Sequence, residues 1–329
     1  MAVAKDSSAG MDSSKQLGVM GILREAMYIP VRNKKLMLPV MLVAFLPSSL
    51  LSVDNYISIY PLLLNFIINL YLLSIKEPST PQFYNLLLQI KEDAEVFVHV
   101  DIIFRVASYM VSFSSMMIIV YFSAMIYSGK QLTPKDLFQR IKGTWKRPLV
   151  TRIYFTLLFV GYTVTSVSLI AMLMLNARGS MVLIVLGALL ALLARLFYVY
   201  LGMVWMVGLV ISVLEDDCYG LQALDKAGHL VKGRRAQGFL IAVILLMVDG
   251  VLNGGYGFGI LKVQSEQVTH QATGLIVLNI LLLLKMFSQV VYTVFYYECH
   301  KSHGREIKVS GDFTYTRVSF TPSDGEVLP

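Results

Sequence analysis

Three ionisable residues lie deep inside long apolar runs of this sequence. Arg195, Asp249 and Lys285 each fall near the middle of such a run. At the centre of a bilayer a charged side chain costs about 3 kcal/mol on insertion scales and usually faces a partner inside the bundle. We therefore expect Asp249 to pair with Arg195, with Lys285 or with both. Such a group would either fix the register of the helices or line a polar pathway, unless one cation extends to an interface.

Three consecutive carboxylates, Glu215, Asp216 and Asp217, follow the apolar run that contains Arg195. Oxygen ligands of this kind can chelate a divalent cation. A solvated helix end explains them equally, and the basic turn at 232–235 is close enough in sequence to pair with them.

A second polar cluster, "ECHKSHGRE", contains Cys299, His300 and His303. A zinc site would need a fourth ligand, and none lies nearby, so we interpret the cluster as a polar tail next to the membrane. Cys299 and Cys218 do not form a disulfide framework. They are free thiols near an interface or sites of reversible palmitoylation.

The sequence contains no Ser/His/Asp set, paired catalytic carboxylates, phosphate-binding loop or metal constellation. An enzyme is therefore the least supported class, and we expect no catalytic residue, no cofactor and no metal. Nucleic-acid binding is also not expected, because the isoelectric point of about 9.2 follows from membrane topology and no recognition module is present.

The elements that position these residues are long apolar segments. Of the 329 residues, 56% are hydrophobic and 15% are charged, with a mean hydropathy of +0.65, whereas a soluble domain has about 25% charged residues. Several runs exceed the roughly 20 residues that cross a bilayer core. The expected spans are 36–53, 100–127, 151–175, 181–214, 238–261 and 272–297.

The run 56–75 is ambiguous because it contains Pro61, Asn65 and Asn69. Lys and Arg concentrate in cytosolic loops. With six spans and both termini in the cytosol, the inside segments hold 21 of these cations and the outside segments hold four. A seventh crossing at 56–75 lowers this contrast to 15 against 10. We therefore predict that 56–75 is an interfacial or re-entrant segment.

Three segments with the same pattern precede three spans, and this predicts an internal repeat. They are "ILREAMYIPVRNKKLML" (22–38), "LFQRIKGTWKRPLVTRI" (137–153) and "ALDKAGHLVKGRRAQGF" (223–239). Each has a short helical stretch, a basic cluster and the start of a membrane helix. Such helices can lie on an anionic leaflet, although topogenic charge alone also explains the cations. The basic residues expected to face lipid are Lys34, Lys35, Lys142, Lys146, Arg147, Lys232, Arg234 and Arg235.

In the third unit, Leu221, Leu224, Gly228 and Val231 have the spacing of an apolar helical stripe. We expect this stripe to contact the membrane surface.

The segment "DGVLNGGYGFG" is rich in glycine. Gly250 and Gly254, and likewise Gly255 and Gly259, are four residues apart, the spacing that lets membrane helices approach closely. We predict close helix packing at these positions, with a flexible gate as the alternative.

The stretch "VISVLEDDCYGLQALDKAGHLVKGRRAQGFLI", together with "RNKKLMLPV", carries a resemblance to a known group. It resembles a plant family of uncharacterised multi-pass membrane proteins. More distantly it is similar to YciC-like proteins and to the membrane domain of some glycerophosphodiester phosphodiesterases. The resemblance covers roughly residues 18–305. It implies a fold and residence in a membrane, and no activity.

Together these features predict an all-α polytopic bundle of about six transmembrane helices, arranged as three repeats of a cytosolic amphipathic helix and a hairpin. We expect a flexible N-terminus (1–20), a membrane domain (21–299) and a cytosolic tail (300–329) that binds a protein partner. The expected function is a membrane scaffold or a protein that interacts with membrane lipids. The alternative is a transporter or channel component that uses the three intramembrane charges. The endoplasmic reticulum and the plasma membrane are favoured over other organelles, and the oligomeric state stays open.

Overall fold

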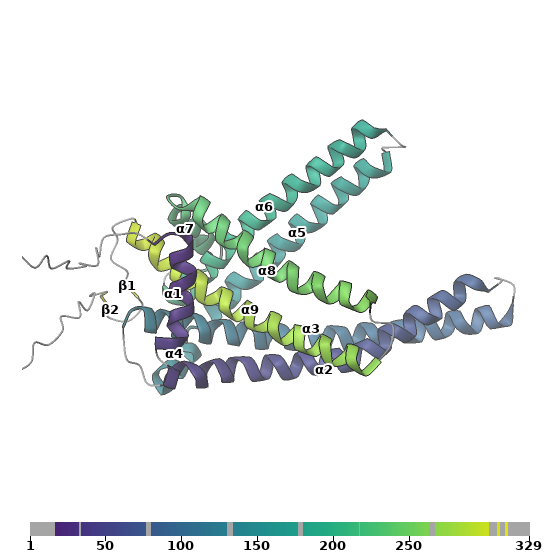
Figure 1. Ribbon diagram of the computed structural model, residues 1–329, viewed down its shortest axis with the longest axis horizontal. Helices are drawn as coiled ribbons and strands as arrows, with labels where there is room; N and C mark the ends of the chain where they lie inside the picture. The colour runs from purple at the N-terminus through teal and green to yellow at the C-terminus, as the bar shows by residue number, and fades with distance from the viewer. Residues whose placement is uncertain are drawn as a thin grey trace, which may run out of the picture.

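The part of the chain that the structure describes is helical, apart from one pair of two-residue strands (Figure 1). The computed structural model describes residues 17–32, 34–76, 80–129, 134–176, 180–216, 218–262, 267–302, 308–309 and 313–314. The helices are α1 (Val19–Arg32), α2 (Lys34–Ile75), α3 (Pro81–Tyr127), α4 (Pro134–Thr144), α5 (Lys146–Asn176), α6 (Met181–Leu214), α7 (Leu221–Val231), α8 (Arg235–Lys262) and α9 (Gln267–Ser302). The strands β1 (Lys308–Val309) and β2 (Phe313–Thr314) pair in antiparallel fashion. Helix α1 thus begins inside the expected N-terminal tail, and α9 ends beyond the expected start of the C-terminal one.

The order of elements confirms the three repeats, because a short helix followed by two long ones occurs three times. The short helices α1, α4 and α7 have 14, 11 and 11 residues, and they gather at one end of the molecule (Figure 1). Within the described residues, six helices are long and apolar enough to cross a membrane. The chain therefore has the architecture of a multi-pass membrane protein with six candidate spans.

The segment 56–75 does not form a separate element, which corrects the prediction of an interfacial or re-entrant stretch. It continues α2 without a break, although Pro39, Pro47 and Pro61 lie inside the helix. Membrane helices tolerate proline when neighbouring groups satisfy the freed backbone. At 1.5 Å per residue, the 42 residues of α2 extend about 63 Å. Because a bilayer core is about 30 Å thick, the hairpin of α2 and α3 is about twice as long as one crossing requires.

Local signals fix the ends of several helices. Pro81 begins α3 directly after Thr80, which has an extended backbone, and proline is well suited to a first helical turn. Gly129 and Gly220 have φ values of +72° and +62°, a conformation that favours glycine. The N–H of Gly220 donates a 2.7 Å hydrogen bond to Thr151 Oγ1, so the start of α7 is attached to α5.

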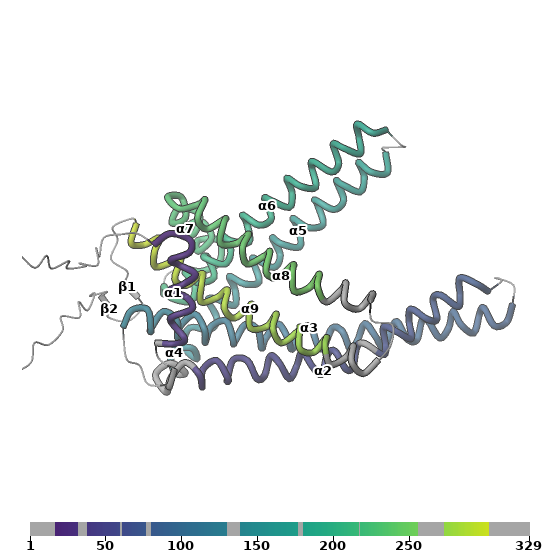
Figure 2. The backbone as a smooth tube through the Cα atoms, viewed as in Figure 1, coloured from purple at the N-terminus to yellow at the C-terminus, as the bar shows by residue number. Residues whose placement is uncertain are grey.

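The long helices pack tightly only near the end that carries the short helices. In α3 the buried residues lie between Phe113 and Ile126, and in α6 mostly between Val199 and Leu214. Beyond these regions two arms diverge: the α5–α6 arm (157–197) and the α2–α3 arm (56–106) (Figure 2). Apolar side chains cover much of the exposed surface of both arms, as expected for helices whose solvent is lipid.

Helix α7 packs with a face that overlaps the predicted stripe only in part. Its buried residues are Ala223, Ala227, Leu230 and Val231, and Leu224 of the stripe also packs against the core, whereas Leu221 is 56% exposed. The core that these residues contact includes α6 and α9. Val231 and Leu224 therefore contact protein, which corrects the expectation that the whole stripe contacts the membrane surface.

The predicted glycine packing is also wrong where the structure can be described. A Cβ added at Gly250, Gly254 or Gly255 would have no neighbour within 4 Å, and Gly259 lies outside the residues whose packing is described. The close approach occurs at Gly238, where an added Cβ would lie 2.7 Å from Phe295 Cζ. Glycine is needed there because α8 contacts α9 directly.

Candidate functional site: a charged cavity between three long helices

A cavity of about 490 Å³ lies where α6, α8 and α9 diverge. Most of its lining is apolar, but it includes one carboxylate, Asp249 of α8, and one ammonium, Lys285 of α9. Ser52 and Ser288 add hydroxyl groups. Small ligand sites have this character, with largely apolar walls and a few polar groups that orient the ligand.

The cavity results from the path of α6. From Val199 to Leu214 this helix is largely buried, whereas most residues between Met181 and Phe197 are exposed. The helix therefore separates from α8 and α9 near Val199. Gly202 lines the cavity, and a Cβ there would have no neighbour within 4 Å. The missing side chain leaves free volume at the point of divergence.

The two charges lie at comparable positions along their helices, measured from the end that carries the short helices. Asp249 lies 14 residues after Arg235, the first residue of α8, which is about 21 Å of helix. Lys285 lies 17 residues before Ser302, the last residue of α9, which is about 26 Å. Both measurements start from the end with the short helices, so the two groups lie at similar depth.

The predicted ion pair is not formed. Among the described residues, no salt bridge joins Asp249 to Lys285 or to Arg195. The Asp249 carboxylate accepts a 3.2 Å hydrogen bond from Asn253 Nδ2, and Lys285 Nζ donates a 3.0 Å bond to Ser112 Oγ. The two charges share a cavity while each uses a different neutral partner.

A second cation lies next to Lys285. Arg152 Nη2 donates a 3.2 Å hydrogen bond to the same Ser112 Oγ, and its guanidinium lies 4.5 Å from the ring centroid of Tyr109. Arg152 was not among the site residues predicted from the sequence. Its place at the start of a long apolar run was the available signal.

Arg195 does not belong to the same group. It is exposed on α6 and lies 5.2 Å from the ring centroid of Tyr198. Tyr198 lines the cavity, but Arg195 does not. Of the three predicted charges, Asp249 and Lys285 therefore line the same cavity, and Arg195 lies on the exposed surface of α6. Arg152, which was not predicted, lies beside Lys285.

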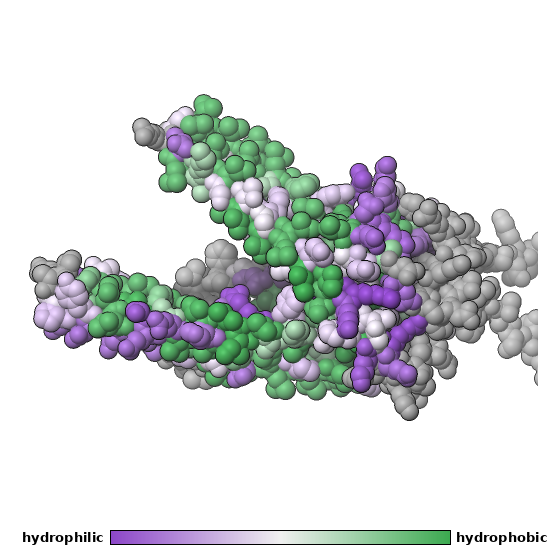
Figure 3. Space-filling model, turned by 180° about the vertical axis from the view of Figure 1, so that it is seen from behind, coloured by the Kyte–Doolittle hydropathy of each residue, from purple (hydrophilic) through white to green (hydrophobic). Residues whose placement is uncertain are grey.

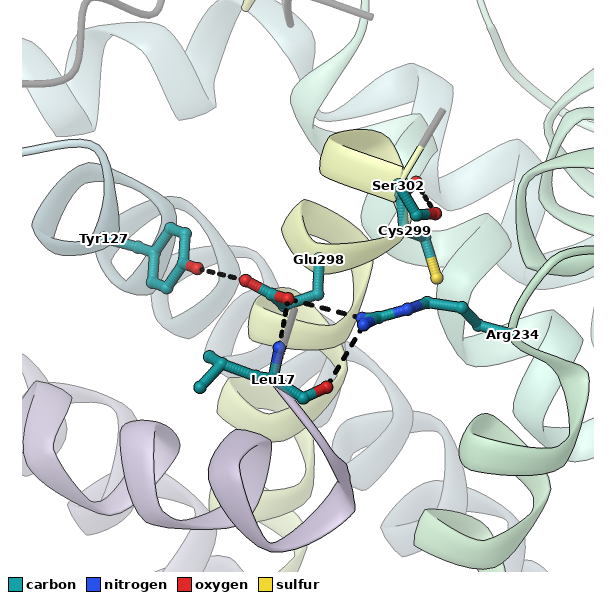
Figure 4. A network of polar contacts seen from close by, with 6 residues as sticks. All are labelled: Leu17, Tyr127, Arg234, Glu298, Cys299 and Ser302. Carbon is teal, nitrogen blue, oxygen red and sulfur yellow. Dashed lines mark hydrogen bonds and ion pairs between the residues drawn. The ribbon is translucent and has the colours of Figure 1, made fainter. Parts of the chain in front are cut away.

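A separate polar network closes the end that carries the short helices (Figure 4). Glu298 Oε2 lies 3.3 Å from Arg234 Nη1, and both side chains are almost fully buried, at 2% and 4% exposure. Glu298 also accepts hydrogen bonds from Leu17 N at 3.1 Å and from Tyr127 Oη at 3.2 Å. Arg234 Nη2 donates to Leu17 O at 3.2 Å. The pair joins the start of α1, the end of α3, the turn before α8 and the end of α9.

This network corrects the prediction that Arg234 faces anionic lipid. Arg234 is buried and paired, whereas its neighbour Arg235 is exposed. Glu298 was taken for part of a polar tail, although it lies in α9 four residues after Val294 and one before Cys299, both of which are fully buried. The helical periodicity of the residues before it was the signal that could have placed it inside.

A second cluster surrounds Glu215 at the end of α6. Lys226 forms an ion pair with it, Tyr296 Oη donates a 2.9 Å hydrogen bond to Oε1, and His300 Nε2 lies 3.6 Å from the same oxygen. Burial alone would raise the pKa of Glu215. The contacts with His300 and Lys226 outweigh burial and lower the pKa to about 2.

These contacts contradict two further predictions. Glu215 and Asp216 pair with Lys226 and Arg147 rather than with the turn 232–235, and the Arg147–Asp216 distance is 3.1 Å. Asp217 lies outside the described residues. His300 is buried in α9 rather than placed in a tail, and His303 is outside the described residues. Cys218 and Cys299 form no disulfide, and Cys299 is fully buried.

The other predicted lipid-facing cations divide into three groups. Arg147 is half-exposed within its ion pair, and the side chains of Lys34 and Lys35 lie outside the described part of the chain. Exposed cations remain at four positions, which are Lys142, Lys146, Lys232 and Arg235. Hydrophilic surface gathers at the end where the short helices lie and also runs along the α2–α3 arm, while the α5–α6 arm is mostly apolar (Figure 3).

The fold has the architecture of a polytopic helical membrane protein, with a cavity between its long helices that is lined by apolar side chains and a few polar groups. The chain belongs to a family that is described as a domain of unknown function (DUF8558), which matches residues 10–311. A comparison with curated proteins finds no match, and a comparison with solved structures finds none either.

Proposed function

We propose that this protein binds membrane lipid, and that the cavity between α6, α8 and α9 receives the polar part of a lipid molecule. The observation that supports this most directly is the combination of a largely apolar wall with Asp249 and Lys285 at similar depth. A lipid is amphipathic in the same way. The divergence of α6 from α8 at the cavity favours entry from the side, through the hydrocarbon region.

The position of the exposed cations supports a lipid-interacting protein in a second way. Lys142, Lys146, Lys232 and Arg235 are exposed on or beside α4 and α7. Each Lys or Arg near an anionic leaflet contributes about 1 kcal/mol. We place this end of the molecule in the cytosol, because Lys and Arg concentrate in its loops. The scaffold role that the sequence suggested requires no cavity, so the cavity favours lipid binding over it.

The experiment uses a variant that fills the cavity. Gly202→Leu places a side chain in open space at the cavity wall, so the variant keeps its fold and loses volume at the site. Gly161→Leu on α5 is a matched control, since Gly161 is exposed and equally free of neighbours. The protein is purified in detergent, and the phospholipids that stay bound are counted by native mass spectrometry. We expect bound lipid to decrease in Gly202→Leu and to be unchanged in Gly161→Leu. Equal retention in both variants contradicts the proposal.

Transport of a solute is the second candidate, and the opposite charges on the cavity wall favour it. In proteoliposomes the same preparations are tested for flux of protons and small ions. Flux that disappears in Asp249→Asn and Gly202→Leu, with bound lipid unchanged, would support transport in place of lipid binding.

A further inference from the structure

Three hydrogen-bond donors converge at one point between α3, α5 and α9. Lys285 Nζ and Arg152 Nη2 both donate to Ser112 Oγ, at 3.0 Å and 3.2 Å. A serine hydroxyl has two acceptor lone pairs and one proton. Since both lone pairs are used, the Ser112 proton remains available for donation to another group.

The two cations have no carboxylate partner. They lie no more than about 6 Å apart, because each is within hydrogen-bond distance of the same oxygen. Among the described residues, neither Arg152 nor Lys285 takes part in a salt bridge. Like charges this close repel one another strongly away from water. An anion between them would remove the repulsion and accept from all three donors.

We propose that Ser112, Arg152 and Lys285 bind the phosphate group of an anionic lipid. A phosphate has several acceptor oxygens, and arginine recognises such groups with its planar fork while lysine adds a point charge. Lys285 also lines the cavity, so a phosphate held here would place the rest of the lipid beside the apolar walls. Hydrophilic surface is visible at the base of the hollow between the two arms (Figure 3). This inference rests on the proposed lipid function and adds the chemical class of the ligand.

Tyr109 and Phe113 hold the arginine in place. The guanidinium lies 4.5 Å and 5.9 Å from their ring centroids, and such stacking fixes its orientation. The Ser112 hydroxyl then sets the spacing of the two cations. The donors are therefore arranged before any ligand arrives, which lowers the entropic cost of binding.

The test compares two lipids that differ only in the phosphate. Phosphatidic acid and diacylglycerol with identical chains are titrated into the purified full-length protein, and the unfolding temperature and the bound lipid are measured. Inorganic phosphate is titrated separately. We expect phosphatidic acid to bind at least about tenfold more tightly than diacylglycerol, since hydrogen bonds to charged groups are the strong ones. Inorganic phosphate should bind far more weakly, because it gains nothing from the apolar walls.

Two variants and two controls complete the design. Lys285→Met and Arg152→Met should each reduce the affinity for phosphatidic acid to near that for diacylglycerol, while Lys285→Arg should retain it within a few-fold. Lys91→Met is the matched control, because Lys91 is exposed in the α2–α3 arm and forms an exposed ion pair with Glu95 there. Circular dichroism confirms that each variant is folded.

The possible results separate this inference from the proposed function. If both lipids bind equally and Lys285→Met changes neither, the phosphate site is refuted while lipid binding stands. If neither lipid binds, both proposals fail. Binding of inorganic phosphate as tight as that of phosphatidic acid would refute a lipid headgroup as the source of the phosphate.

Discussion

The ion pair between Glu298 and Arg234 should be the most sensitive point of the fold. Its two side chains are 2% and 4% exposed, and Glu298 also accepts from Leu17 N and Tyr127 Oη. Removal of one partner leaves the other charge buried without compensation, which costs about 3 to 5 kcal/mol. We therefore expect Glu298→Gln and Arg234→Met each to lower the free energy of unfolding by about this amount.

The double variant tests the physical reason. If burial of an unpaired charge causes the loss, Glu298→Gln combined with Arg234→Met should be more stable than the sum of the single effects, by about 1 to 3 kcal/mol. The free energy of unfolding is measured by denaturant titration in mixed micelles. Limited proteolysis of the same samples should show release of α1, because Leu17 O loses its donor Arg234 and Leu17 N loses its charged acceptor.

A matched pair provides the control. Arg147 and Asp216 lie 3.1 Å apart but are 40% and 38% exposed, and exposed pairs contribute about 0 to 1 kcal/mol. Arg147→Met should therefore have a small effect. The reasoning is refuted if the effects of Glu298→Gln and Arg234→Met on the free energy of unfolding add within about 0.5 kcal/mol in the double variant. It is also refuted if Arg147→Met destabilises the protein as much as either of them.

Two further predictions concern stability. Glu215→Gln should destabilise the protein by about 2 to 3 kcal/mol at neutral pH, because the pKa of the carboxyl is lowered from 4.5 to about 2. A carboxyl group whose pKa is lower in the folded protein stabilises the fold at pH values above its pKa in the unfolded protein. The difference in stability between wild type and variant should therefore be constant above about pH 5. It should shrink as the pH falls from 4.5 towards 2, and a difference that grows in acid would contradict it. Gly238→Ala should cost about 1 to 3 kcal/mol through overpacking against Phe295, whereas Gly250→Ala should be neutral or slightly stabilising, since it meets no atom within 4 Å. Thermal unfolding of both glycine variants measures this, and equal effects would refute the assignment of the close helix contact.

The repeats and the spans could be predicted because they depend on composition averaged over many residues. A basic cluster followed by a long run of apolar residues gives the same signal whichever way each helix is rotated. The orientation of single side chains could not be predicted in this way. Arg234 and Arg235 are adjacent and identical in type, yet one is buried and the other exposed, because Arg234 lies in the turn before α8 and pairs with Glu298, whereas Arg235 begins the helix.

The glycines illustrate the same limit. Spacing of four residues marks a face of α8 but does not say which face meets a neighbour, and the contact occurs at Gly238 rather than at Gly250 or Gly254. The length of α2 was missed for another reason. Pro61 and the two asparagines of 56–75 argue against a helix in water, but they do not interrupt one whose backbone groups pair internally.

Two sets of charged side chains in the described residues differ in how they are paired, and the difference argues for a ligand. Near the short helices, Glu298, Glu215 and Asp216 each have a basic partner, and these pairs join α6, α8 and α9 with the elements around them. Near the cavity, Arg152 and Lys285 both donate hydrogen bonds to the neutral hydroxyl of Ser112, and Asp249 accepts a hydrogen bond from Asn253. A chain that needed these three groups only for stability would gain most by pairing them directly, as it does with Glu298. Their lack of pairing is costly in the apo protein and becomes favourable once an external anion satisfies the two cations.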